Sequence, residues 1–412
     1  MKRLLLGCAA CCSALLFTQS TYAAAFQFYE LGAPSNGTAN VGQAAIASDA
    51  STAYFNPAGM AHLPDSEFML GAQSILTYTN FSPNSTNTIT GGNGGNAGGL
   101  IPGSDAYFVY NYSPQLKVGA SLTTPYGGSL NYNNFWVGRY YVQQMQFYTL
   151  NLNPAIAYQV NPWLAVGAGL AIEYANLYQT VAIPIGVLLG GLGLGGFDGQ
   201  ATVKADNTSP GFNLGVLMTP QDSTRIGVAY RSQIVHNLRG NVSFINIGIT
   251  PEASTRLVMP ANIIASLSQA LTHQFTFLAE LGWANWSTMT DSIIDVEGLE
   301  VVNRMNWHDT YRVGLGGQYQ WNTALQVQAG ASYDSSPTNS NRRLPDLPMD
   351  RQFRFGLGIN YALLRAVHLG LSYEYINLGP ASIYNVSDNG VFSGSYARDY
   401  ANVVQVSLNV NV

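Results

Sequence analysis

The segment from Trp307 to Trp321 alternates between two faces that suit different solvents. Side chains alternate across a β-strand, so the odd-numbered positions share one face and the even-numbered positions share the other. The odd-numbered face has an aliphatic middle between aromatic residues, whereas the even-numbered face is polar or small. Aromatic residues on both sides of a short apolar band are typical of a strand that faces lipid. Asp309 fits this interpretation only if it lies above the bilayer.

The same alternation recurs in three later segments, at residues 353–361, 367–375 and 404–412. In each of them, aromatic or aliphatic residues on one face oppose Gly or polar and charged residues on the other. A soluble sheet can alternate in this way, but the repeated aromatic borders favour a barrel that crosses a membrane. The pattern therefore predicts an all-β protein, a transmembrane β-barrel.

The N-terminus has the features of an export signal. Lys2 and Arg3 precede an apolar run from Leu4 to Phe17, and small residues follow at 23–25, which predicts a signal peptide over residues 1–24. All three cysteines lie inside it, so the exported chain is expected to have neither disulfides nor cysteine chemistry. Only 9% of the residues are charged, against about 25% in a soluble domain. We therefore expect the outer membrane of a Gram-negative bacterium as the location.

Six short turn signals divide the rest of the chain into intervals long enough for two strands and a loop. The turns are Ser113-Pro114, Asn161-Pro162, Pro220-Gln221-Asp222, Thr272-His273, Asn322-Thr323 and Leu364-Arg365. They predict a 14-stranded antiparallel barrel over residues 65–412 with both ends in the periplasm. Twelve strands remain an alternative if the turn at Thr272 is misread.

Residues 25–64 do not alternate and are rich in Gly and Ala. A barrel of this width has a lumen to fill, and its predicted inward faces are rich in Gly and Ser. We predict that this segment is an N-terminal plug (hatch) in the lumen, with a free periplasmic tail as the alternative.

Two loops are more apolar than exposed loops usually are, and we predict that they capture an apolar ligand. The alternative is that they pack on themselves or on each other. The residues singled out are Phe135, Trp136, Tyr140, Val181, Ile183, Ile185, Leu188, Leu189 and Phe197.

Several short motifs, in order, resemble the FadL/TodX family of outer-membrane transporters for long-chain fatty acids and other hydrophobic compounds. They include Asn56-Pro57-Ala58, Tyr230-Arg231-Ser232, Asn285-Trp286-Ser287, Trp307-His308-Asp309 and Tyr333-Asp334-Ser335-Ser336-Pro337. The resemblance covers essentially the whole exported chain. It implies a monomeric barrel in which Asn56, Pro57 and Ala58 belong to the hatch. Substrate is then expected to pass from the loops to an inner pocket, and to leave sideways through a kink in the third strand.

The resemblance places that kink at Pro125, Tyr126, Gly127 and Gly128. The residues agree independently, because Pro125 cannot donate to a β-ladder and the two glycines have no side chains to pack. The alternative is that the strand simply ends there and enters its loop.

Fatty-acid transporters of this family carry basic groups in the pocket, and His308 stands where members commonly have Lys. His308 and Arg312 share the predicted inward face, and Arg304 is near in sequence, so these three are the candidate head-group contacts. Arg312 could equally pair with lumen carboxylates such as Asp49. The weak basicity leaves an uncharged hydrocarbon substrate open.

We therefore predict passive uptake of long-chain fatty acids or related hydrophobic compounds. The alternatives are a channel for uncharged aromatic or aliphatic hydrocarbons and a structural or adhesin barrel. The hatch and the apolar loops argue against an open pore, and no serine–histidine motif supports an enzyme. We expect outer-membrane lipid and lipopolysaccharide as neighbours, and neither cofactor, metal site nor nucleic-acid partner.

Overall fold

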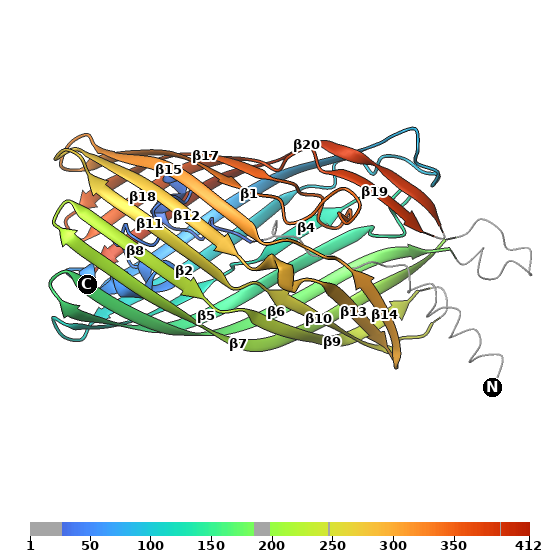
Figure 1. Cartoon of the computed structure of the whole chain (residues 1–412), viewed down its shortest axis with the longest axis horizontal. Coiled ribbons are helices and arrows are strands. Elements are labelled where there is room, and N and C mark those ends of the chain that lie inside the picture. Colours follow the sequence, from blue (N-terminus) through green and yellow to red (C-terminus); the bar gives the residue numbers. More distant parts are fainter. Residues whose placement is uncertain (1–26, 185–197, 246–247, 388) are drawn as a thin grey trace, which may run out of the picture.

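The computed structural model describes residues 27–184, 198–245, 248–387 and 389–412, without the side chains of 291–294 and 299–304. The predicted signal peptide over residues 1–24 therefore lies outside the described residues. The chain forms a closed antiparallel barrel of 14 strands, as predicted (Figure 1). Among the described residues, no helix combines the length and apolar character needed to cross a bilayer.

The described strands, some of which are segments of one barrel strand, run as follows. They are β1 (Glu67–Pro83), β2 (Leu100–Asn111), β3 (Leu116–Thr123), β4 (Gly127–Asn131), β5 (Gln144–Asn161), β6 (Leu164–Ile183), β7 (Gly199–Gln221), β8 (Thr224–Arg231), β9 (Ile234–Phe244), β10 (Glu252–Met259), β11 (Asn262–Ala270), β12 (Phe275–Ala284), β13 (Asp291–Val296), β14 (Leu299–Arg304), β15 (Thr310–Gln320), β16 (Leu325–Asp334), β17 (Gln352–Leu364), β18 (Val367–Asn377), β19 (Ser382–Ser387) and β20 (Gly390–Asn411).

Each barrel strand pairs with its neighbours along the chain, and β1 pairs with β20 to close the ring. Three barrel strands are interrupted, so that β3 and β4, β8 and β9, and β10 and β11 each form one of them. The hairpins β13–β14 and β19–β20 extend the wall beyond the ring at one end. All six predicted turns lie between consecutive barrel strands, which confirms the count and excludes the alternative of twelve.

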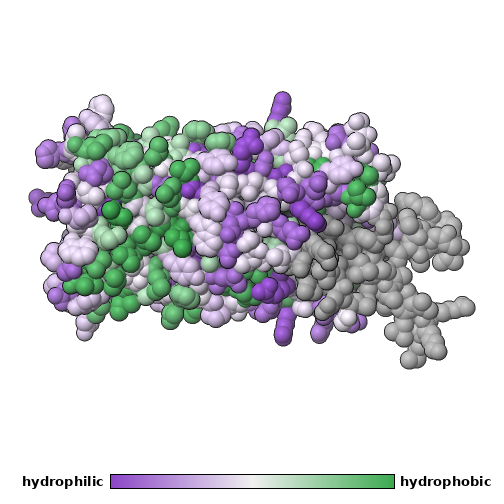
Figure 2. Space-filling view, viewed as in Figure 1, coloured by the Kyte–Doolittle hydropathy of each residue, from purple (hydrophilic) through white to green (hydrophobic). Residues whose placement is uncertain are grey.

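The outer face carries a band of exposed apolar side chains. Figure 2 shows these side chains gathered toward the end of the barrel where the C-terminus lies, with a more polar surface beyond them. In β15, Tyr311, Val313 and Leu315 are exposed as predicted, because they alternate with buried residues. The alternation does not extend to Trp307, which is 4% exposed and packs near Trp286, their ring centroids 5.7 Å apart. The strand begins only at Thr310, so this part of the prediction is wrong.

The N-terminal segment 27–63 lies inside the ring of strands (Figure 1). It contains two 3₁₀ helices, η2 (Pro34–Thr38) and η3 (Pro57–His62), and a short helix α2 (Thr52–Phe55). A further 3₁₀ turn, η4 (Trp286–Thr288), lies after β12. Inward-facing glycines allow the segment to touch the wall. A Cβ atom at Gly227 would lie 1.8 Å from the carbonyl oxygen of Ala44.

Candidate functional site

The wall is unpaired beside the third barrel strand. β2 pairs with β3 from Asn111–Lys117 to Ala106–Leu122, and β4 pairs with β5. No pairing joins β2 to β4 among the described strands. Pro125, which interrupts the strand between β3 and β4, has no N–H group to donate. An opening in the backbone ladder therefore lies between the first half of β2 and β4.

Backbone contacts frame this opening. At one end, the backbone N–H of Thr124 donates to the Asp105 carboxylate at 3.1 Å. At the other end, the N–H of Asn131 donates to the carbonyl oxygen of Ala97 at 2.9 Å. Tyr126 is held to β5, since the Thr149 N–H donates to its carbonyl at 2.9 Å. The structure thus places Pro125 to Gly128 at the edge of a bounded gap.

The first described residues of the chain lie against the gap from inside the barrel. The Phe28 N–H donates to the carbonyl oxygen of Pro125 at 2.8 Å, and Gln27 forms an antiparallel bridge with Tyr126. A Cβ atom at Gly127 would lie 2.7 Å from the Phe28 ring, so the glycine makes room for this ring. The N-terminal segment is therefore attached to the kink itself.

A narrow cavity begins at Gly127 and Gly128 and extends into the barrel, with about 640 Å³ of empty space in total, part of which is open solvent. The larger apolar side chains that line it come from the N-terminal segment, five barrel strands, the loop before β17 and the loop after β18. They are Phe28, Ile75, Ile101, Leu130, Met145, Leu347, Met349, Ile376 and Leu378. Such a lining can take the apolar part of a ligand out of water.

Glu30, Gln352 and Arg354 line the polar side of the cavity. The Arg354 guanidinium forms an ion pair with Glu30 and lies 3.4 Å from Asp334 and 3.6 Å from Glu374. It also donates to the side-chain oxygen of Gln352 at 2.5 Å. The arginine that lines the cavity is thus already surrounded by acceptors.

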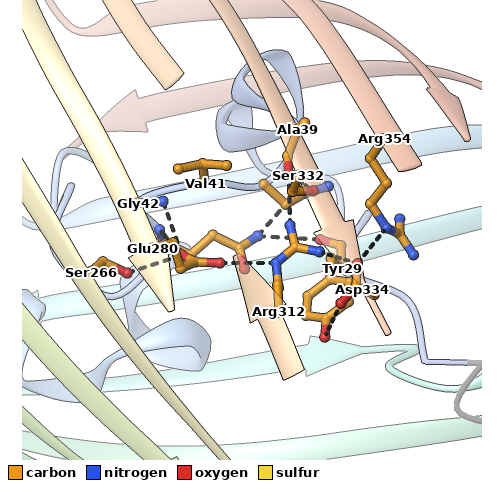
Figure 3. Close-up of polar contacts among 12 residues, drawn as sticks. Tyr29, Ala39, Val41, Gly42, Ser266, Glu280, Arg312, Ser332, Asp334 and Arg354 are labelled. Carbon is orange, nitrogen blue, oxygen red and sulfur yellow. Dashed lines mark hydrogen bonds and ion pairs between the residues drawn. The ribbon is translucent and has the colours of Figure 1, made fainter. Parts of the chain in front are cut away.

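Arg312 occupies the centre of a second set of contacts (Figure 3). Its guanidinium lies 3.1 Å from Glu280 and 2.8 Å from Asp334, and it donates to the carbonyl oxygen of Ala39 at 2.8 Å. The guanidinium carbon, Cζ, also lies 4.1 Å from the centre of the Tyr29 ring. Burial, together with Asp334, raises the pKa of Tyr29 above its usual range, so this phenol stays neutral. Arg312 therefore joins two barrel strands to the N-terminal segment.

Glu280 binds the N-terminal segment from β12. It accepts hydrogen bonds from the backbone N–H groups of Gly42 at 2.9 Å and Gln43 at 3.2 Å, and from the Ser266 hydroxyl at 3.0 Å. Together, the two clusters contain four carboxyl groups, of Glu30, Glu280, Asp334 and Glu374, and two guanidinium groups. Because these charges pair with one another, they hold the N-terminal segment in place and are not free to bind a ligand.

The predicted head-group contacts are not brought together at the cavity. His308 lies outside β15 and is exposed, and its backbone N–H donates to Pro337. The prediction that it shares an inward face with Arg312 is wrong, because the strand begins after it. Arg312 pairs with Glu280 and Asp334, which agrees with the alternative of lumen carboxylates although Asp49 is not the partner. Arg304 ends β14, and its side chain lies outside the described part of the chain.

The predicted capture loops are mostly packed. Trp136 is fully buried and stacks on Tyr132 with ring centroids 3.8 Å apart, and Val181 and Ile183 are 2% exposed in a cluster with Phe244. The prediction of an exposed apolar surface is wrong for these three predicted residues. Trp136 packs against Phe81 and Phe392, whereas Val181 and Ile183 lie on β6 and face a separate cluster. Phe135 is exposed, and Tyr140 is partly buried with its hydroxyl donating to Asp198. Ile185, Leu188, Leu189 and Phe197 lie outside the described residues.

Asn56, Pro57 and Ala58 lie where η3 meets β6 and β7. The Asn56 amide donates to the carbonyl oxygens of Ala44 at 2.6 Å and Val216 at 3.1 Å, and its oxygen accepts from the Ala58 N–H at 3.1 Å. A Cβ atom at Gly215 would lie 2.0 Å from the Asn56 oxygen. Asn56 thus fixes the fold of the segment and its contact with the wall.

Glu30, Glu280, Arg354 and Asp399 were not predicted from the sequence as site residues. One signal was present, because charged residues on inward faces are conspicuous in a chain with 9% charged residues. Their pairing across distant strands had no local signature. In the described part of the chain, no group of three or more His, Cys, Asp or Glu side chains could hold a metal ion.

The fold and this framed opening define the protein as an outer-membrane transport barrel. Residues 14–412 match the family described as outer membrane protein transport protein (OMPP1/FadL/TodX), and the chain belongs to that family. The long-chain fatty acid transport protein of Escherichia coli K12 is 26% identical, over 89% of this chain and 92% of the relative. Members of the family are transport channels for hydrophobic compounds rather than enzymes.

Solved structures show the same fold. A Pseudomonas aeruginosa FadL homologue superposes with a TM-score of 0.86 at 20% identity, covering 94% of this chain and 99% of the other. The Ralstonia pickettii toluene transporter TbuX superposes with a TM-score of 0.68 at 19% identity, again over 94% and 99%. At these identities the likeness concerns the fold alone.

Proposed function

We propose that this protein takes up long-chain hydrophobic compounds, fatty acids or molecules of similar size, by passive diffusion through the cavity beside β4. The observation that carries the proposal is the continuity between an apolar cavity and a gap in the wall. Gly127 and Gly128 line the cavity and also edge the gap. A ligand in the cavity therefore has a short path to the surrounding bilayer.

Release into the bilayer suits an apolar ligand better than release into the periplasm. Each methylene group removed from water contributes about 0.8 kcal/mol, so a twelve-carbon chain gains roughly 9 kcal/mol before binding costs. A route through the periplasmic half of the lumen would lose this free energy. The space there is lined largely by Ser, Asn, Gln and charged residues. Passage through the gap keeps the chain out of water and requires no energy input.

In this proposal residues 25–64 act as a hatch, and Phe28 holds the start of the hatch against the kink. Phe28 and Gln27 are attached to the kink, whereas Arg312 and Glu280 hold the middle of the segment. Release of the first residues alone would uncover the gap while the rest of the segment keeps the lumen closed. The protein would work as a monomer, because the cavity and the gap belong to one chain, with lipopolysaccharide and lipid around the barrel.

Among its described lining residues, the cavity does not offer a free basic group to a carboxylate head group, although the E. coli relative is named a long-chain fatty acid transport protein. Arg354, the arginine that lines the cavity, is paired with Glu30 and lies near two more carboxyl groups. An anionic ligand would have to displace Glu30 from it. This arrangement favours the second candidate function, uptake of uncharged hydrocarbons, for which the toluene transporter offers a structural parallel.

The test is to fill the cavity beside the gap. Gly128 has open space on the cavity side, and the nearest atom to an added Cβ is the Met145 methyl carbon at 3.6 Å. Gly128→Trp should abolish binding of dodecane and dodecanoate and reduce cellular uptake to the level of cells without the protein. Gly128→Ala, which fits without a clash, is the matched control. Unchanged uptake by a correctly folded Gly128→Trp variant would contradict the proposal.

A further inference from the structure

Asp399 brings a carboxyl group to the apolar side of the cavity. It lies on β20, is 3% exposed and lines the cavity together with Ile75, Ile101 and Leu378. One carboxyl oxygen, Oδ1, accepts a hydrogen bond from the Thr79 hydroxyl at 3.0 Å. The other, Oδ2, is buried and has no hydrogen-bond partner. A buried oxygen of this kind is costly unless something binds it.

The protein itself provides no counter-ion for this group. Among the ion pairs of the described side chains, none includes Asp399, and Arg354 is occupied by Glu30, Asp334 and Glu374. Ile376, Leu378 and Ala401 form an aliphatic cluster on this side of the cavity. The polar neighbours of Asp399 are Thr79, Asp346 and the hydrogen-bonded hydroxyl groups of Tyr132 and Tyr396, and none of them binds Oδ2. The partner that suits Oδ2 is therefore expected to come from the ligand in the cavity.

The chemistry of Oδ2 limits what that partner can be. A hydroxyl group both donates and accepts, so it can bind Asp399 in either protonation state. An ionised carboxylate can bind only the protonated form, and an alkane offers no partner. We propose, building on the proposed function, that the cavity selects uncharged hydrophobic molecules with a hydroxyl group, and that Asp399 is the residue that recognises this group.

Around the barrel the cavity extends from Asp399 on β20 past Ile75 on β1 and Ile101 on β2 to Gly127 and Gly128 on β4. A ligand whose hydroxyl group binds Asp399 therefore directs its chain toward the gap. Its polar group then stays at the Asp399 end while the chain reaches the bilayer first. Selection by a hydroxyl group is thus compatible with lateral release.

The experiment is equilibrium binding of three twelve-carbon probes, dodecane, 1-dodecanol and dodecanoate, to the full-length protein in nanodiscs. For the unaltered protein, 1-dodecanol should bind at least about tenfold more tightly than dodecane, as expected for one hydrogen bond to a carboxyl group. Asp399→Leu, close in size but apolar, should remove this difference while dodecane still binds. Asp399→Asn supplies an amide donor, so it should increase the affinity for dodecanoate relative to the affinities for the other two probes.

The matched control is Asp206→Leu, the same substitution at an exposed position on β7 away from the cavity. It should leave all three affinities unchanged. Equal binding of 1-dodecanol and dodecane by the unaltered protein, or an unchanged preference in Asp399→Leu, would overturn the role of Asp399 and leave the proposed function intact. Failure of all three probes to bind the unaltered protein would instead refute the proposed function. Retained dodecane binding shows that a variant is folded.

Discussion

Replacing Arg312 with alanine should release the middle of the N-terminal segment from the barrel wall. The guanidinium is 3% exposed and binds Glu280, which is fully buried, and Asp334, which is 15% exposed. Removing one partner of a buried ion pair costs about 3–5 kcal/mol, because the other charge is left uncompensated. The lost hydrogen bond to the Ala39 carbonyl acts in the same direction. The barrel ladder itself is unaffected.

Hydrogen exchange followed by mass spectrometry measures this change directly. The backbone N–H groups of Gly42 and Gln43 are bound to the Glu280 carboxylate, so a peptide covering residues 39–46 reports on the contact. A loss of about 3–5 kcal/mol corresponds to exchange that is roughly a hundredfold to a few thousandfold faster, if the segment opens before it exchanges.

The control is Arg398→Ala, which removes the same side chain from an exposed position on β20. It should leave exchange in residues 39–46 unchanged, because Arg398 makes no ion pair in the described structure. Equal protection of this peptide in Arg312→Ala and the unaltered protein would refute the claim that the charge cluster holds the segment.

Three further perturbations test other contacts. Gly227→Ala would place a Cβ atom 1.8 Å from the Ala44 carbonyl oxygen, and such overpacking typically costs about 1–3 kcal/mol. Residues 39–50 should become sensitive to protease in this variant and not in Gly128→Ala. Tyr132→Phe removes a hydroxyl that bonds to the Pro345 carbonyl and to the Tyr396 hydroxyl, both at 2.8 Å. Hydrogen exchange in residues 344–349 should therefore accelerate by about fivefold to tenfold. An unchanged rate would show that the hydroxyl does not hold this loop. Burial, and then Arg225, lower the pKa of His62, which lies 3.1 Å from the Thr219 hydroxyl. Since the released segment takes up a proton near pH 6.5 and the packed one does so only at lower pH, packing should weaken as pH falls below about 6.5. The difference in exchange between pH 7 and pH 5 should be smaller in His62→Gln, and an equal difference would contradict this role of His62.

The barrel was predictable because its strands follow a local rule. Lipid on one side and a packed lumen on the other require alternation in every strand, and turn residues mark where it stops. The alternation gave a wrong strand boundary at Trp307, because it continues in the sequence beyond the point where the inter-strand hydrogen bonds of β15 end. A period of two shows that a strand is compatible with a segment but does not show where its ladder begins.

The candidate site was only partly predictable. The resemblance placed the kink, and Pro125 and two glycines agreed with it because they act locally on the backbone. The apolar loops were misinterpreted, since a large apolar content is equally compatible with burial, and Trp136 packs inside the extracellular loops. The Glu30–Arg354 and Glu280–Arg312 pairs join residues far apart in the chain, so no local spacing could reveal them.

A reversible tether tests most directly whether the first residues of the hatch must leave the gap. Gln27 and Tyr126 face each other across an isolated antiparallel bridge, a geometry within reach of a disulfide. All native cysteines lie at positions 8, 11 and 12, within the predicted signal peptide, so an introduced pair is expected to be alone in the exported protein. Each single-cysteine variant controls for the loss of the native side chain.

The measurement is uptake of dodecane by cells carrying Gln27→Cys with Tyr126→Cys, before and after reduction. If the first residues of the hatch must leave the gap, the oxidised protein should bind dodecane without transporting it. Reduction should then restore transport to the level of the single-cysteine variants. Equal transport by the oxidised and reduced forms would contradict release through the gap beside β4.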